Sequence, residues 1–147
     1  MAAFMKKQGA GFYLNAIATV LGIAGLVAMV ICSNMTSAYA LHSLTKLLVE
    51  AVIGIVLVIL AIYAPNRFGN HDYISTVSIL AAIGLFSAII GSVISDRILL
   101  ISGLFSYNSG NMIGWSVFYA TATSLACFLI AILFLIAGAF ARSVKEV

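Results

Sequence analysis

Four long apolar runs constrain the fold of this chain more than any other feature of its sequence. They cover about residues 12–32, 45–64, 73–95 and 113–141. A bilayer's hydrocarbon core is about 30 Å thick, and a helix of roughly 20 apolar residues spans it. Backbone groups find no water inside lipid, so such runs cross it as helices. The sequence therefore predicts an all-α polytopic membrane protein, an up-down four-helix transmembrane bundle forming a single domain over residues 1–147.

Composition and charge placement support a membrane location and suggest an orientation. The chain is 64% hydrophobic and 7% charged, whereas about a quarter of the residues in a soluble domain are charged. Short loops rich in lysine and arginine stay in the cytoplasm. One side of the four-span layout holds five basic residues and the other holds two, which predicts that both termini are cytoplasmic. The five are Lys6, Lys7, Arg67, Arg142 and Lys145, and the two are Lys46 and Arg97.

The third apolar run is interrupted by the adjacent charges Asp96 and Arg97 and then continues to Phe105. A single helix from Tyr73 to Phe105 would be about 50 Å long, well beyond the thickness of the hydrocarbon core. We therefore expect the span to end near Ser95. The short segment 98–105 is expected either to lie in the outer interface or to re-enter the bundle.

The first run has a second interpretation, as a signal peptide. Lys6 and Lys7 precede it, and Ala38-Tyr39-Ala40 resembles a cleavage site. Secretory apolar regions are about 7–15 residues long, and this run is longer, which favours a retained span. Cleavage after Ala40 stays open as the alternative, and it would leave three spans with the same orientation.

Four charged residues gather at the outer ends of the second and third spans: Lys46, Glu50, Asp96 and Arg97. If these spans touch, Lys46 faces Asp96 and Glu50 faces Arg97. Ionisable groups inside membranes are rare and are often functional. The cluster is therefore a candidate ion or solute site, and the alternative is a pair of interfacial ion pairs that set helix register.

Small residues recur at helical spacing in two spans. Ala18 and Gly22 share one side of the first span, and Gly84, Ala88 and Ser92 recur every four residues in the third. Small side chains let membrane helices approach closely. The pattern predicts helix packing, either inside one bundle or against another copy or a partner's helix.

Motifs for catalysis, metals and cofactors are missing from the sequence. No nucleophile elbow, zinc-protease motif or phosphate-binding loop occurs, so we expect no enzyme activity, no catalytic residue and no cofactor. His42 and His71 fall on opposite sides of the bilayer, which argues against a metal site. Cys32 and Cys127 differ in depth by roughly 20 Å, too far for a disulfide, so both are predicted to be free thiols. No basic face is present that would bind nucleic acid.

Two short stretches resemble known families. The residues GWSVFY at 114–119 and LACF at 125–128 resemble the start of the fourth span of claudin-like tetraspan proteins. That family has a long first outer loop with a W-x-L-W motif and two cysteines, and here that loop is about a dozen residues with neither, so no function follows. The opening KKQGAGFY at 6–13 resembles small uncharacterised four-span bacterial membrane proteins. This resemblance implies a multi-pass protein of a bacterial plasma (inner) membrane.

These features favour a non-enzymatic role. We expect a structural or accessory subunit that packs its helices against itself, as a homo-oligomer, or against a larger membrane-protein complex. The alternative is a protomer of an oligomeric small-solute or ion transporter or channel, in which Glu50 and the outer charges act.

Overall fold

The computed structural model contains four long helices, and the described part of the chain has no strand. It describes residues 9–35, 41, 44–68, 73–107 and 109–141. The helices are α2 (Ala10–Asn34), α3 (Leu44–Phe68), α4 (Tyr73–Phe105) and α5 (Met112–Phe140). Each is long and apolar enough to cross a bilayer. The predicted all-α four-helix bundle is therefore confirmed.

Several predictions from the sequence concern residues outside the described ranges. These are the cleavage site at 38–40, the two histidines His42 and His71, and the basic residues Lys6, Lys7, Arg142 and Lys145. The orientation of the termini and the part of each helix that lies within lipid stay predictions.

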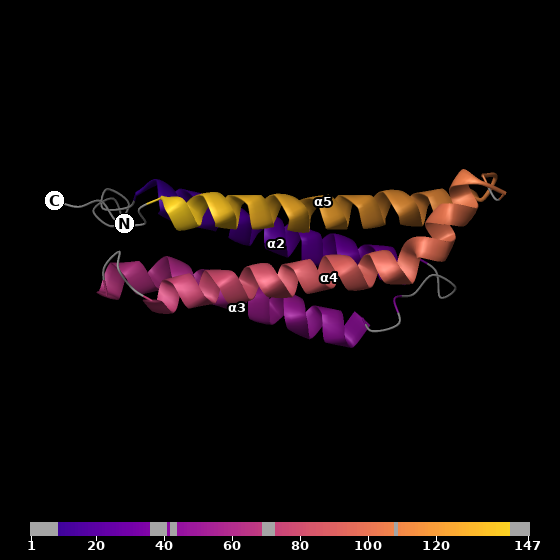
Figure 1. Ribbon diagram of the computed structural model, residues 1–147. Coiled ribbons are helices and arrows are strands. Elements are labelled where there is room, and N and C mark those ends of the chain that lie inside the picture. The colour runs from indigo at the N-terminus through magenta and orange to yellow at the C-terminus, as the bar shows by residue number, and fades with distance from the viewer. Residues whose placement is uncertain (1–8, 36–40, 42–43, 69–72, 108, 142–147) are drawn as a thin grey trace.

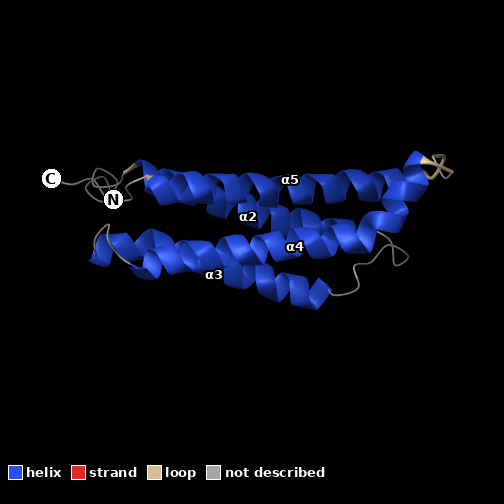
Figure 2. Ribbon diagram, in the orientation of Figure 1, coloured by secondary structure: helices blue, strands red, loops and turns tan. Residues whose placement is uncertain are grey.

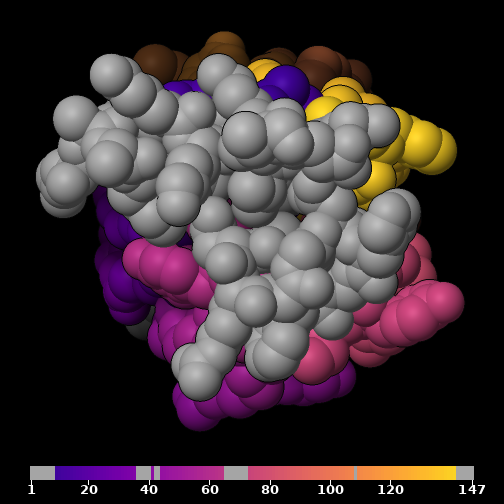
Figure 3. Space-filling model, turned by 90° about the vertical axis from the view of Figure 1, so that its left-hand side faces the viewer, coloured from indigo at the N-terminus to yellow at the C-terminus, as the bar shows by residue number. Residues whose placement is uncertain are grey.

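The helices alternate in direction and form a ring of four neighbours (Figure 1). The most extensive contact joins α2 to α5, and the pairs α3–α4, α4–α5 and α2–α3 close the ring. Figure 2 shows the same arrangement as an almost entirely helical structure. Seen from the end where α2 begins and α5 ends, the described atoms of the four helices take the corners of a roughly square section (Figure 3).

Two large aromatic rings fill the centre of the bundle because glycines on neighbouring helices leave space for them. Phe86 of α4 and Phe128 of α5 are fully buried, with ring centroids 5.4 Å apart. A Cβ atom at Gly54 would lie 2.7 Å from the Phe86 ring, and one at Gly22 would lie 3.3 Å from it. Gly25 stands in the same relation to Phe128, at 3.2 Å. Close helix approach and interlocking rings therefore define this core.

A proline near the end of α3 is accommodated by a hydrogen bond from α4. The sequence suggests that Pro65 ends the second span, yet α3 continues to Phe68. Proline has no N–H to donate to the carbonyl four residues earlier, here that of Ala61. The Ser75 hydroxyl of α4 donates to this carbonyl at 3.1 Å. The bond satisfies the carbonyl and ties the two helices together near the point where α3 ends and α4 begins.

The α2–α5 contact buries polar side chains. The Ser124 hydroxyl donates to the carbonyl of Gly25 at 2.9 Å, across the two helices. Asn15 is also fully buried, and its amide is without a hydrogen-bond partner among the described residues. Gly138 leaves room for it, since a Cβ there would lie 2.5 Å from the Asn15 Oδ1 atom. This pair of helices is thus matched by shape as well as by hydrogen bonding.

The last third of α4 differs from the expectation that the span ends near Ser95, before the charges Asp96 and Arg97. The helix runs through both charges to Phe105, over 33 residues. Its last turns lean toward α5 (Figure 1), and the Phe105 ring lies 5.3 Å from Trp115 and 5.6 Å from Phe118, centroid to centroid. The segment 98–105 is therefore a bent continuation of the helix that packs on the start of α5, where Asn111 caps the first turn by accepting from the Gly114 N–H at 3.0 Å.

Candidate functional site

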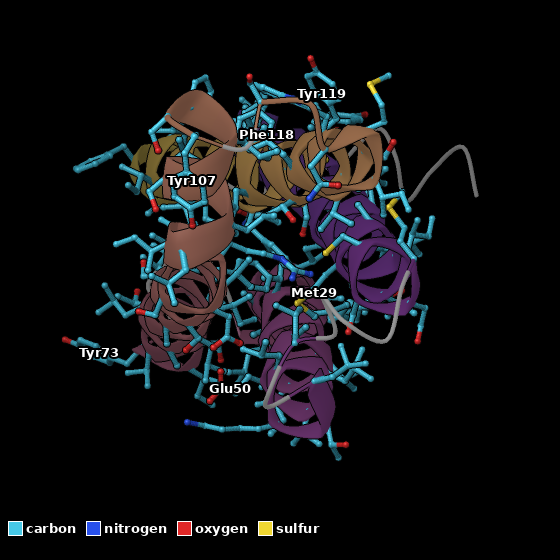
Figure 4. All side chains as sticks on the ribbon, turned by 90° about the vertical axis from the view of Figure 1, so that its right-hand side faces the viewer. Met29, Glu50, Tyr73, Tyr107, Phe118 and Tyr119 are labelled. Atoms are coloured by element: carbon cyan, nitrogen blue, oxygen red, sulfur yellow. The ribbon has the colours of Figure 1, made fainter. Side chains whose placement is uncertain are left out.

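A groove of mixed polarity opens between the first turn of α3 and residues 88–96 of α4. Its volume is about 500 Å³, within the range of small-molecule sites. Both helices contribute side chains to it: Lys46 and Leu47 from α3, and Ala88, Gly91, Ser92, Ser95 and Asp96 from α4. Lys46 and Asp96, predicted to face each other, therefore line the same groove. Figure 4 is viewed from the end of the bundle where α3 begins, and it shows Glu50 between α3 and α4.

Glu50 forms its ion pair within its own helix. Its Oε1 atom lies 3.7 Å from the Lys46 Nζ atom, one helical turn away. The Lys46 side chain is 71% exposed, whereas that of Glu50 is 18% exposed. The other carboxylate oxygen of Glu50, Oε2, is buried and has no hydrogen-bond partner in the described part of the chain. Glu50 is therefore the carboxylate of this cluster that combines shielding with an unused acceptor.

Arg97 is buried inside the bundle and bonds to α2. It is 3% exposed, and its Nη2 atom donates to the Cys32 carbonyl at 3.3 Å. That carbonyl belongs to the last turn of α2, which has no basic residue of its own. Carbonyls at a helix C-terminus lack intrahelical partners and carry the negative end of the helix dipole. Arg97 thus supplies from α4 the positive charge that the end of α2 lacks.

The predicted charge cluster is consequently divided into two parts. Lys46, Glu50 and Asp96 belong to the groove region between α3 and α4, whereas Arg97 points toward α2. In place of the predicted Glu50–Arg97 pair, Glu50 pairs with Lys46, and Arg97 donates to the Cys32 carbonyl. The adjacent positions 96 and 97 differ because successive residues on a helix point about 100° apart, and position 97 shares the buried face of Phe86 and Val93.

The predicted packing residues differ in how far they are buried. Ala18 and Gly22 lie buried inside the bundle. Gly84 and Ala88 are exposed on the side of α4 that faces away from the bundle, and a Cβ at Gly84 would meet no atom of the described residues within 4 Å. Ser92 is half-buried and lines the groove. Packing of the four helices within one chain therefore does not use Gly84 or Ala88.

Three further small residues extend this outer surface of α4 and were not singled out from the sequence. Ala81, Gly91 and Ser95 are exposed like Gly84 and Ala88. Together the five follow a repeat of alternating three- and four-residue steps: Ala81, Gly84, Ala88, Gly91 and Ser95. That repeat is the signal that sequence reasoning missed, because it considered only four-residue spacing. We call these five residues the α4 seam.

Cys32 is buried, Cys127 is half-buried and both are free thiols, as predicted. Among the described residues no group of three histidine, cysteine or acidic side chains is arranged to hold a metal ion.

Comparisons with protein-family models, curated protein sequences and solved structures found no match to this chain. The class of protein is therefore defined by the fold itself. Four apolar helices of membrane-spanning length, assembled into one bundle, make this a small multi-pass integral membrane protein.

Proposed function

We propose that this protein is a structural or accessory membrane subunit that assembles through the α4 seam with a second copy of itself. The observation that supports the proposal is the exposure of small residues over about four helical turns. A Cβ at Gly84 or Gly91 would meet no atom of the described residues within 4 Å. Before the seam begins, α4 has large exposed side chains, such as those of Val77 and Leu80.

The spacing of the seam matches a known mode of helix pairing. Steps of three and four residues average 3.5, the period that keeps one stripe of a helix facing its partner in a left-handed coiled coil. In lipid, helices associate through close packing and not through hydrophobic burial, so small residues favour the contact. Two-fold symmetry places the same patch on both partners, and a row of small residues is complementary to itself.

The cellular setting belongs to the same proposal. The charge distribution of the sequence supports cytoplasmic termini, and we propose the plasma (inner) membrane of a bacterium as the location. In this setting nearly all of the described residues lie in the four helices, and the exposed faces of these helices are surfaces available to a protein partner.

Bulky substitutions in the seam should dissociate the assembly. For Gly84→Leu combined with Gly91→Leu, we expect association at least about tenfold weaker than in the wild type, which corresponds to about 1.4 kcal/mol. The matched control is Ala24→Leu, at an exposed small residue of α2, which should leave association unchanged. Native mass spectrometry across a range of protein-to-detergent ratios measures the monomer–dimer balance.

A wild type that remains monomeric at every ratio would contradict self-assembly. The monomer could instead co-purify with one larger membrane protein, and the Gly84 and Gly91 variant could lose it. That result would identify the larger protein, and not a second copy, as the partner of the seam.

Glu50 supports a second candidate function, transport of an ion or small solute. Its Oε2 atom is shielded and has no hydrogen-bond partner among the residues that the structure describes, as in a group that exchanges a proton or cation. Ion and solute flux into proteoliposomes, compared between wild type and Glu50→Gln, separates the two functions. The subunit proposal predicts no Glu50-dependent flux. Flux that the substitution abolishes would overturn it in favour of transport.

A further inference from the structure

The groove between α3 and α4 changes in polarity along its length. At its outer end stand Lys46, Ser95 and Asp96, with Ser92 one helical turn further in. Its inner end is formed on α4 by Gly91 and Ala88, whereas Leu47 follows Lys46 directly on α3. From Asp96 to Ala88 the helix advances about 12 Å. The groove is thus charged at its Asp96 end and apolar at its Ala88 end.

We infer that this groove binds the headgroup and upper glycerol region of a phospholipid with a phosphoethanolamine headgroup. A membrane lipid has the same polarity gradient as the groove, in the same direction relative to the bilayer. A water-soluble solute of similar size would leave the apolar inner half without a matching surface. The volume of about 500 Å³ accommodates a headgroup, and the acyl chains continue along the apolar surface of the two helices.

Charge selects the headgroup. The Lys46 ammonium is 71% exposed and lies at the groove wall, where it binds the lipid phosphate. An ammonium carries three donors, so Lys46 contacts Glu50 and a phosphate at the same time. Asp96 lies on the facing helix and accepts hydrogen bonds from the ethanolamine ammonium.

Other common headgroups match these two charges less well. A choline headgroup has the same net charge, but its quaternary ammonium has no N–H to donate to Asp96. A glycerol headgroup offers no positive charge to Asp96, and its phosphate remains near that carboxylate, where like charges repel. The hydroxyls of Ser92 and Ser95 are neutral donors and acceptors that serve any of the three. Lys46 thus sets affinity for phosphate, and Asp96 sets the preference for ethanolamine.

The groove overlaps the α4 seam in part, so a bound lipid and the helix of a second copy compete for the shared residues. Ala88, Gly91 and Ser95 belong to both, whereas Ser92 and Asp96 are half-buried toward α3 and Gly84 lies outside the groove. Lipid binding does not rest on the proposed self-assembly, and substitutions at Ser92, Asp96 and Gly84 test the two separately.

Native mass spectrometry of the detergent-solubilised protein, with three lipids of identical acyl chains, tests the inference. We expect phosphatidylethanolamine to bind about tenfold more tightly than phosphatidylcholine or phosphatidylglycerol, as the loss of one charge-assisted hydrogen bond implies. Asp96→Asn should remove most of that preference. Ser92→Leu should fill the groove and reduce binding of all three lipids. Gly84→Leu should leave lipid binding unchanged, and circular dichroism confirms that each variant keeps its helices.

Equal binding of the three lipids to the wild type would overturn the inference, as would a preference for ethanolamine that survives Asp96→Asn. Binding unaffected by Ser92→Leu would place the lipid elsewhere and contradict the assignment. Soluble glycerophosphoethanolamine serves as competitor. It should not displace the lipid at equal concentration, and displacement would identify a soluble phosphoethanolamine compound as the ligand instead.

Discussion

Arg97→Glu is expected to destabilise the bundle by at least about 3 kcal/mol, the cost of breaking a buried charge contact by changing one partner. The guanidinium donates to the Cys32 carbonyl at the end of α2. A glutamate carboxylate would face the Cys32 carbonyl oxygen, and neither group can donate a hydrogen bond to the other. It would also place a negative charge at the negative end of the α2 dipole. Because the site is 3% exposed, water cannot screen the repulsion. Reversible unfolding in mixed micelles measures the change in free energy of unfolding.

Two controls separate the contribution of the charge from that of its burial. Arg97→Lys keeps the positive charge and should lose less stability than Arg97→Glu. Lys46→Glu makes the same charge change at a side chain that is 71% exposed, where we expect a loss of at most about 1 kcal/mol. If Lys46→Glu and Arg97→Glu lowered stability equally, the buried contact between α4 and α2 would not have the role given to it.

Phe86→Ala is expected to lower the free energy of unfolding by about 2–3 kcal/mol. In lipid the transfer of an apolar side chain contributes little, since acyl chains are as apolar as the core. The cost comes from the cavity, at about 24 cal/mol per Å³ over roughly 100 Å³ of lost side chain. Gly22 and Gly54 both face the Phe86 ring, and neither has a side chain that can fill the space.

The matched control for Phe86→Ala is Leu80→Ala on the same helix, where the side chain is 64% exposed. Lipid replaces the missing atoms there, so we expect a change of about 0.5 kcal/mol or less. Equal losses at Phe86 and Leu80 in the same unfolding assay would show that the ring pair of Phe86 and Phe128 is not the centre of the core.

The existence of the four helices followed from the sequence because length and apolarity alone decide it. A run of about twenty apolar residues has few alternatives to a helix in lipid. The assignment of helix faces did not follow, since the inside and outside of a membrane bundle are equally apolar and periodicity carries little information. Gly54 and Gly84 illustrate this point. The same residue type lies against Phe86 in one case and on the open surface of α4 in the other.

The candidate site was predictable in part. Lys46 and Asp96 were expected at the same depth on neighbouring spans, and they line one groove. Arg97 was expected at the membrane surface because a charge next to Asp96 suggests the end of a span. Arg97 is buried because it donates to a carbonyl at the C-terminus of α2. The residues around Arg97 in the sequence give no indication of that contact. The hydrogen bond from Ser75 to the Ala61 carbonyl was not predictable for the same reason. It links a carbonyl that Pro65 leaves unsatisfied in α3 to a hydroxyl in α4.

The central claim of alternating membrane-spanning helices is tested most directly by thiol labelling. Single cysteines at Asn70, between α3 and α4, and at Ser109, between α4 and α5, are introduced after Cys32 and Cys127 are replaced by alanine. A membrane-impermeant maleimide is then applied to intact cells and to permeabilised cells. We predict that the Ser109 position is labelled in intact cells and that the Asn70 position is labelled only after permeabilisation. Labelling of both positions from the same side of the membrane would contradict the four-span bundle.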